Sequence, residues 1–223
     1  LEGGQISLSV GLASALCAAV IGTAIGLAAG YLGGWLDALL MRLVDSVIAL
    51  PLLPLLIVMA AIDPAKLGLE ETADASTFGL IRIIVIVSLV GWTTPARLVR
   101  GATLAARAQG YVQAARALGV PPLAIALRHI LPNISGPLIV ATTLAMGQVI
   151  LFESALSFLG LGIQPPTASW GNMLTGAQEM IWQAPMLAVY PGLAIFLTVV
   201  SVNFVGDALQ DALSTRATER EGN

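Results

Sequence analysis

Residues 113–132 read Gln-Ala-Ala-Arg-Ala-Leu-Gly-Val-Pro-Pro-Leu-Ala-Ile-Ala-Leu-Arg-His-Ile-Leu-Pro and lie between long apolar segments. The surrounding region, residues 75–152, contains no acidic residue. Gly119 follows a run of good helix formers, and helices commonly end at a glycine in the left-handed conformation. Pro121 and Pro122 then suit the first turn of a new helix. The stretch therefore predicts two helices joined by a tight turn.

The first of these helices is expected over Thr103–Leu118, and the second over Pro122–Ile130, where Pro132 closes it. Apolar residues recur on the first helix at spacings of four and three, which predicts one apolar stripe. The stripe consists of Leu104, Ala108, Tyr111, Ala115 and Leu118. Such a stripe needs a surface to cover it, either other helices of this chain or a separate subunit.

The composition places most of the chain in a membrane. Apolar residues make up 57% of the 223 residues and charged residues only 10%, and the mean hydropathy is +0.89. A soluble domain normally carries about a quarter charged residues. One cysteine, Cys17, and one histidine, His129, exclude an internal disulfide and a Cys/His metal cluster. The only lysine, Lys66, is not in a Gly-Lys-Ser/Thr phosphate loop, so the chain is not itself an ATPase.

Five segments are apolar and long enough to span a bilayer, which takes about 20 residues. They are Ile6–Gly30, Met41–Ile62, Phe78–Ala96, Ile134–Phe152 and Pro185–Gly206. In the first span, small residues recur every fourth position and predict close approach of another helix. These are Ala18, Gly22, Gly26 and Gly30. In the second span, Pro51 and Pro54 are both expected to kink the helix, and in the third Arg82 is close enough to an end to snorkel.

Five spans place the two termini on opposite sides, and the basic residues then predict the orientation. One side carries Arg42, Arg97, Arg100, Arg107, Arg116, Arg128, Arg216 and Arg220; the other carries Lys66, Arg82, Asp63, Glu70, Glu71 and Asp74. The loop of about residues 97–133 and the C-terminus are therefore expected to be cytoplasmic. Leu1 would lie outside, and a further helix before it would give six spans with both ends inside. The acidic external loop 63–77 has no assigned role.

The central loop resembles a known motif. Gln113-Ala114-Ala115, three residues, Gly119, nine residues and then His-Ile-Leu-Pro, ending at Pro132, resemble the EAA loop of binding-protein-dependent ABC importer permeases. The resemblance implies that this loop forms a coupling helix that docks into a groove of an ATPase subunit. Gln113 replaces the consensus glutamate, and His129 replaces a consensus aliphatic residue.

Four other stretches are similar to the peptide branch of the same family. They are residues 29–37, 90–100, 153–174 and 191–198, followed by Gly206-Asp207. Together they resemble the C-type permease of dipeptide, oligopeptide and nickel importers. The resemblance implies an all-α, polytopic helical bundle in the bacterial inner membrane, with residues 1–223 forming a single transmembrane domain.

The resemblance also implies partners. These are a second, related permease, two cytoplasmic ATPases that use ATP with Mg²⁺, an external substrate-binding protein and the lipid bilayer; no cofactor bound by this chain and no nucleic acid is implied. The expected cargo is a dipeptide or oligopeptide, with nickel or another small solute as the alternative. A secondary transporter driven by an ion gradient would need charged residues at the membrane midplane. An intramembrane enzyme would need a catalytic pair, and His129 lies in the loop.

Three groups of residues are candidates for function. The ATPase-docking group is Gln113, Ala114, Ala115, Arg116, Gly119, Val120, Pro121 and Pro132. The helix-packing group is Gly22, Gly26 and Gly30. The candidate gate or pathway group is Pro51, Pro54, Met59 and Glu153, in which Glu153 could equally serve as a hydrogen-bonding residue at the end of its span.

Overall fold

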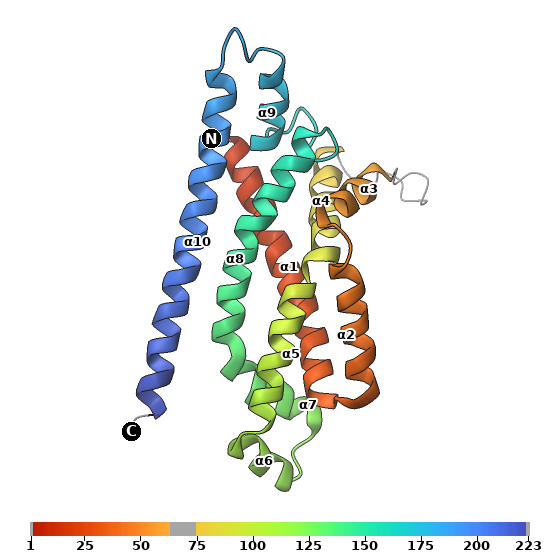
Figure 1. The fold of residues 1–223 in the computed structure, drawn as a ribbon, viewed down its shortest axis with the longest axis vertical. Coiled ribbons are helices and arrows are strands. Elements are labelled where there is room, and N and C mark those ends of the chain that lie inside the picture. Colours follow the sequence, from red (N-terminus) through yellow and green to blue (C-terminus); the bar gives the residue numbers. More distant parts are fainter. Residues whose placement is uncertain (1, 63–74, 222–223) are drawn as a thin grey trace. The chain divides into compact units, whose positions relative to one another are not determined.

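The computed structural model describes residues 2–62 and 75–221, and this part of the chain is helical without strands (Figure 1). The acidic segment expected to be an external loop lies almost wholly outside the described residues. In chain order the helices are α1 (Glu2–Leu32), α2 (Gly34–Ile48), α3 (Leu52–Ala61), α4 (Ala75–Gly91), α5 (Thr93–Arg107), α6 (Gly110–Ala117), α7 (Pro122–Ala124), the π-helix η2 (Ile125–Ile130), α8 (Leu131–Phe158), α9 (Trp170–Gln178) and α10 (Met186–Glu221).

Up to five spans are present in the described residues, as the sequence predicted. Three continuous helices are long and apolar enough to cross a membrane: Glu2–Leu32, Pro122–Phe158 and Met186–Ala212. Two broken pairs pass the same test when each is taken as one span. These pairs are Gly34–Ile48 with Leu52–Ala61, and Thr77–Gly91 with Thr93–Arg107. The chain is therefore a polytopic helical membrane protein.

The chain divides into two compact units. One consists of Leu1–Leu16, Pro51–Val90 and Leu144–Phe204, and the other of Cys17–Leu50, Gly91–Thr143 and Val205–Asn223. The second unit contains the central loop and two buried apolar clusters. One cluster is built from Leu27, Val99, Ala106, Val112, Ala115, Ile125, Ile130 and Ile134, and the other from Ala18, Val44, Trp92 and Ala96.

In the second unit, α1 and α5 approach so closely that backbone meets backbone. A Cβ added to Gly22 would lie 2.6 Å from the carbonyl oxygen of Trp92. A Cβ added to Gly26 would lie 2.6 Å from the carbonyl oxygen of Ala96. One added to Gly30 would lie 2.7 Å from Cβ of Thr103. The small residues therefore provide the space for this contact.

Only one of the two prolines of the second predicted span breaks a helix. Pro51 has an extended conformation (φ −65°, ψ 114°) and precedes α3. The expectation that Pro54 also kinks the chain is wrong, because α3 is continuous through it. Pro54 is the third residue of α3, where a backbone N–H has no helical acceptor, so its missing donor costs nothing.

Arg82 bonds to the protein itself. Its guanidinium donates to the carbonyl oxygens of Ala60 and, at 3.1 Å, Ile62. These carbonyls end α3, where a positive charge is favourable. Arg82 thus covers carbonyl groups that would otherwise lack partners.

Candidate functional site

The loop that carries the EAA-like motif begins with a helix break that the sequence did not predict. Thr103–Leu118 is not one helix, because α5 ends at Arg107 and α6 starts at Gly110. Between them Ala108 is still helical, but Gln109 is extended at φ −72° and ψ 148°. The N–H groups of Val112 and Gln113 bond the carbonyl of Gln109, at 3.1 and 3.2 Å, and start the new helix.

This break divides the predicted apolar stripe between α5 and α6. Of its five residues only Ala115 is buried, whereas Leu118 is 83% exposed. The buried positions are instead Thr103 and Ala106 on α5 and Val112 and Ala115 on α6. The interruption shifts the phase of the second helix, so the five residues do not form one continuous stripe, and the described helices of this chain leave Tyr111 and Leu118 exposed.

The turn after α6 has the predicted glycine conformation. Gly119 has φ 74°, in the left-handed region. Its N–H donates to the carbonyl of Arg116 at 2.9 Å, and the N–H of Val120 donates to that of Ala115 at 3.1 Å. These two bonds form a Schellman motif, which satisfies the last carbonyls of the helix. A Cβ on Gly119 would meet nothing within 4 Å, so the requirement for glycine is conformational rather than steric.

The second helix does not stop at Pro132. Helical structure runs without interruption from Pro122 through η2 into α8, and Pro132 is the second residue of α8. The prediction that Pro132 ends the helix is therefore wrong. In η2 the backbone N–H groups bond carbonyls five residues back instead of four. This shift just before Pro132 means that no helical bond depends on the N–H that proline lacks. Asn133 Nδ2 donates to the carbonyl of His129 at 2.7 Å and supports the altered turn.

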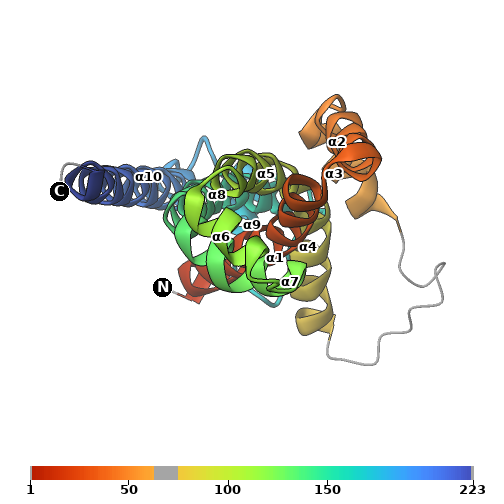
Figure 2. The same cartoon turned by 90° about the horizontal axis from the view of Figure 1, so that it is seen from below.

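One face of the loop is buried, and the other is exposed in the described part of the chain. Val112 and Ala115 of α6 belong to the same buried cluster as Ile125 and Ile130 of η2. The ribbon of this loop is seen from below in Figure 2. The opposite surface, here called the loop face, carries exposed apolar side chains. It consists of Tyr111, Leu118, Leu123 and Leu127, of which Leu118 and Leu123 are 83% and 70% exposed. An apolar face of this kind around a rigid turn is suited to contact with another protein.

Arg116 and Arg107 both turn toward the end of α1. The guanidinium carbon of Arg116 lies 5.1 Å from the centre of the Tyr31 ring, a cation–π contact. Nη1 of Arg107 donates to the carbonyl of Tyr31 at 2.9 Å and to that of Gly30 at 3.4 Å. These contacts fix the loop to the C-terminal end of α1, where positive charge is favourable.

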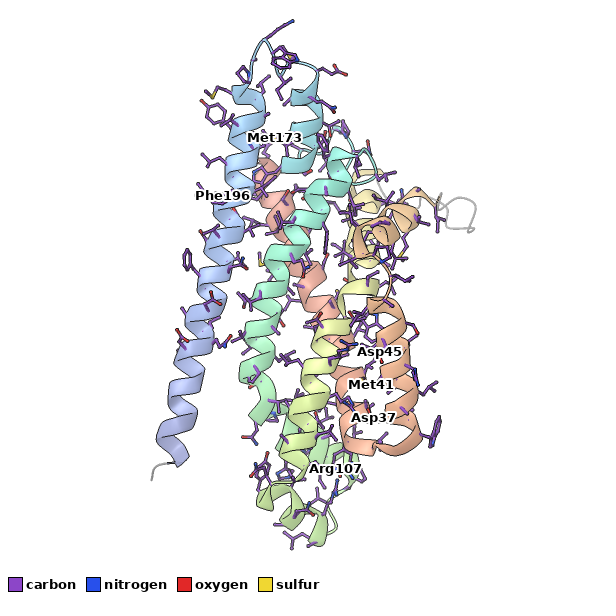
Figure 3. The ribbon with its side chains drawn as sticks, in the orientation of Figure 1. Asp37, Met41, Asp45, Arg107, Met173 and Phe196 are labelled. Atoms are coloured by element: carbon purple, nitrogen blue, oxygen red, sulfur yellow. The ribbon has the colours of Figure 1, made fainter. Side chains whose placement is uncertain are left out.

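Two ion pairs join α5 to α2. Their acidic partners on α2, Asp37 and Asp45, are labelled in Figure 3. Arg100 forms a two-point contact with Asp37: Nε lies 2.5 Å from Oδ1 and Nη2 lies 2.7 Å from Oδ2. Arg97 contacts Asp45 at 2.5 Å in a more exposed position. Arg97 and Arg100, at the start of the loop, therefore hold two helices of the same unit together, a role the sequence did not indicate.

Gln113 has a local contact that a glutamate would not make. Its Nε2 donates to the carbonyl of Arg107 at 3.1 Å, at the end of α5. An ionised glutamate has no donor for this bond. Gln113 therefore closes the break between α5 and α6, while Ala114, Gly119 and Pro121 remain exposed beside it.

Glu153 is in the other unit and is fully buried. Its Oε1 accepts from Ser157 Oγ at 2.8 Å, and its Oε2 accepts from Ser7 Oγ at 3.0 Å and Ser154 Oγ at 3.4 Å. Buried carboxylates need such donors. Among the other candidate gate residues, Pro51 and Pro54 are exposed and Met59 is partly buried on α3. Within residues 2–62 and 75–221, no group of three or more His, Cys, Asp or Glu side chains could hold a metal ion.

Residues 22–219 match the family of the binding-protein-dependent transport system inner membrane component. The chain belongs to this family. This permease is thus a membrane-spanning component of an ABC importer in the inner membrane, as the resemblance implied. Its match includes the whole loop, the stripe Gly22, Gly26 and Gly30, and Glu153.

Named relatives are similar in sequence, and a solved structure is similar in fold. The permease is 43% identical over 216 residues to the glutathione transport system permease protein GsiD of Shigella flexneri serotype 5b (strain 8401) and covers 67% of it. It is 42% identical over the same length to GsiD of Escherichia coli O6:K15:H31 (strain 536 / UPEC). The fold is similar to a chain of the MetNI methionine ABC transporter in an inward-facing conformation, with a TM-score of 0.72, 19% identity and 94% of each chain covered.

Proposed function

We propose that this permease imports short peptides, of the size of a dipeptide or of glutathione, as one of two related permeases in an ATP-driven complex. The observation that supports the cargo is the identity of 43% to a glutathione transport permease over 97% of this chain. Two ATPases would bind the cytoplasmic loops of the two permeases, and an external binding protein would deliver the peptide.

The loop face supports the proposed contact with an ATPase. Leu118 and Leu123 are exposed at a turn held by Gly119 and the Schellman bonds. The buried side of the loop is fixed to α1 through Arg107 and Arg116. A partner that binds the loop face would therefore push on a rigid element rather than on a flexible loop. The orientation rests on the basic residues around the loop, which favour the cytoplasmic side.

The proposed division of labour places selectivity largely in the binding protein. Two charged groups of the helices are already engaged within the protein: Arg82 with carbonyls of α3, and Glu153 with three serines. Neither is presented as a free charge for a substrate. Docking of the loops and closure of the ATPases would then rock the bundle between inward-open and outward-open forms.

The test is uptake into vesicles that contain the complete complex. Labelled glutathione and a labelled dipeptide are supplied with and without ATP inside and with and without the binding protein outside. We expect uptake that requires both internal ATP and the external binding protein. Uptake without ATP would indicate a secondary carrier. ATP hydrolysis stimulated by the binding protein without uptake of either peptide would reject the peptide cargo, and nickel would be the next solute tested.

A further inference from the structure

The Glu153 carboxylate is the centre of a buried network that reaches beyond its own helix. Ser7 is on α1, and Ser154 and Ser157 are on α8 with Glu153 itself. Ser7, Glu153, Ser154 and Ser157 are all buried. Three hydroxyl groups donate to one carboxylate, so its oxygens have partners although they are removed from water.

Two of these hydroxyls, those of Ser7 and Ser157, also accept a hydrogen bond from a backbone N–H of the chain that follows α8. Ser157 Oγ accepts from the N–H of Ile163 at 3.0 Å, and Ser7 Oγ accepts from the N–H of Trp170 at 3.2 Å. Each serine therefore links a backbone N–H to Glu153. The carboxylate accepts a hydrogen bond from each of these two hydroxyls. It therefore orients each serine oxygen with a lone pair toward the segment.

The segment concerned is Leu159–Gln178, here called the α8–α9 segment. It leaves α8 through Gly160, which has φ 75°, and ends with α9. It packs tightly on the serines: a Cβ on Gly162 would lie 2.2 Å from Ser157 Oγ, and one on Gly171 would lie 2.4 Å from the Ser154 carbonyl oxygen. Met173, labelled in Figure 3, is 46% exposed on α9. One side of the segment is thus held against the network while other side chains face outward.

We propose that Glu153 is a positioning residue, which through Ser7 and Ser157 holds the α8–α9 segment in the shape that the external binding protein contacts. The proposal rests on the proposed function, which places the loop before α8 in the cytoplasm and hence the segment after α8 outside. Glu153 is buried, so it touches neither the binding protein nor the peptide. Its effect is preorganisation: a segment already held in its bound shape loses less conformational freedom on docking.

The first measurement is amide hydrogen exchange in the complete complex in lipid nanodiscs. Ser7→Ala should raise exchange at the Trp170 amide and Ser157→Ala at the Ile163 amide, whereas Glu153→Gln should raise both. A general loss of stability would raise exchange at both amides in every variant and would not separate the effects of the two serines. Thr143→Ala is the matched control on α8, because its hydroxyl bonds the Ile139 carbonyl within the same helix. Unchanged exchange at both amides in Glu153→Gln would overturn the proposal.

The second measurement is ATP hydrolysis against the concentration of loaded binding protein. Glu153→Gln and Ser7→Ala should raise the half-saturating concentration by about fivefold or more, with a smaller change in the rate at saturation. Raised exchange with an unchanged half-saturating concentration would overturn the docking role. A wild-type complex that the binding protein does not stimulate would instead reject the proposed function, and it would be recognised before any variant is compared.

Discussion

At the scale of single residues, Gly119 shows how one backbone angle controls the loop. Its φ of 74° costs a non-glycine residue about 1–2 kcal/mol, and more when the side chain is β-branched. Gly119→Val should therefore move the turn, lower transport at least tenfold and leave membrane insertion intact. Gly101→Ala on α5 is the control, because a Cβ there meets nothing and φ is ordinary. Normal peptide uptake by Gly119→Val would contradict the role of the turn.

The two ion pairs between α2 and α5 give a second prediction at this scale. The Arg100 and Asp37 side chains are 34% and 16% exposed, whereas those of Arg97 and Asp45 are 49% and 55% exposed. Solvent weakens the more exposed pair. Asp37→Asn should cost about 1 kcal/mol and Asp45→Asn less than about 0.5 kcal/mol, measured by thermal unfolding of the complex in nanodiscs. Equal losses, or a larger loss for Asp45→Asn, would show that the two-point geometry adds nothing.

Residue-level contacts also mark a limit of inference from sequence. The conformation of Gly119 was predictable because local geometry alone determines it. The pairing of Arg100 with Asp37 was not, since 63 positions separate them and an arginine near a membrane end has an adequate explanation as an interfacial anchor. The same holds for Ser7 and Glu153, which are 146 positions apart.

At the scale of helices, the contact between α1 and α5 predicts a sharp difference between neighbouring substitutions. Gly26→Leu should destabilise the complex by about 2–3 kcal/mol, because the first added carbon already meets the carbonyl of Ala96 at 2.6 Å. Ala24→Leu adds a large side chain to an exposed position of the same helix and should change stability by less than about 0.5 kcal/mol. The yield and thermal unfolding of the assembled complex measure both. Tolerance of Gly26→Leu would mean that α1 and α5 can separate without penalty.

Helix boundaries in the loop were harder to predict than helix contacts. The spacing of Ala18, Gly22, Gly26 and Gly30 is a local pattern with one physical reading, and α5 lies against it. The break at Gln109 lies directly before Gly110, a poor helix former, but the prediction followed the surrounding Ala, Arg and Gln residues, which favour a continuous helix. Pro132 misled in the opposite direction, because a π-helical turn before it lets the chain stay helical.

At the scale of the whole molecule, the loop face predicts how assembly can be separated from folding. Leu118 is 83% exposed, so Leu118→Glu should leave the permease folded, with stability changed by less than about 0.5 kcal/mol. Its affinity for the ATPase should fall about tenfold or more, since an apolar contact is replaced by a charge. Gln109→Glu adds the same charge at the start of α6 and should bind normally. Equal ATPase binding by both variants in a pull-down titration would place the contact elsewhere.

The overall architecture was predictable because composition leaves few alternatives. A chain with 57% apolar and 10% charged residues must form membrane helices, and the Gln-Ala-Ala…Gly119 spacing identified the family. The described helices and the family match confirm both. The burial of Glu153 is different, because a glutamate at the end of a span has the same sequence signature whether it faces water or a ring of serines.

The glycine contact between α1 and α5 has a mechanical consequence. Most helix pairs are separated by a layer of side chains, which can change rotamer and absorb small displacements. Here the backbones themselves touch at Gly22 and Gly26, so that layer of side chains is missing. The two helices can therefore shift little relative to each other. Arg107 also bonds the end of α1, so a displacement applied at the turn should move α1 and α5 together and by almost the same distance.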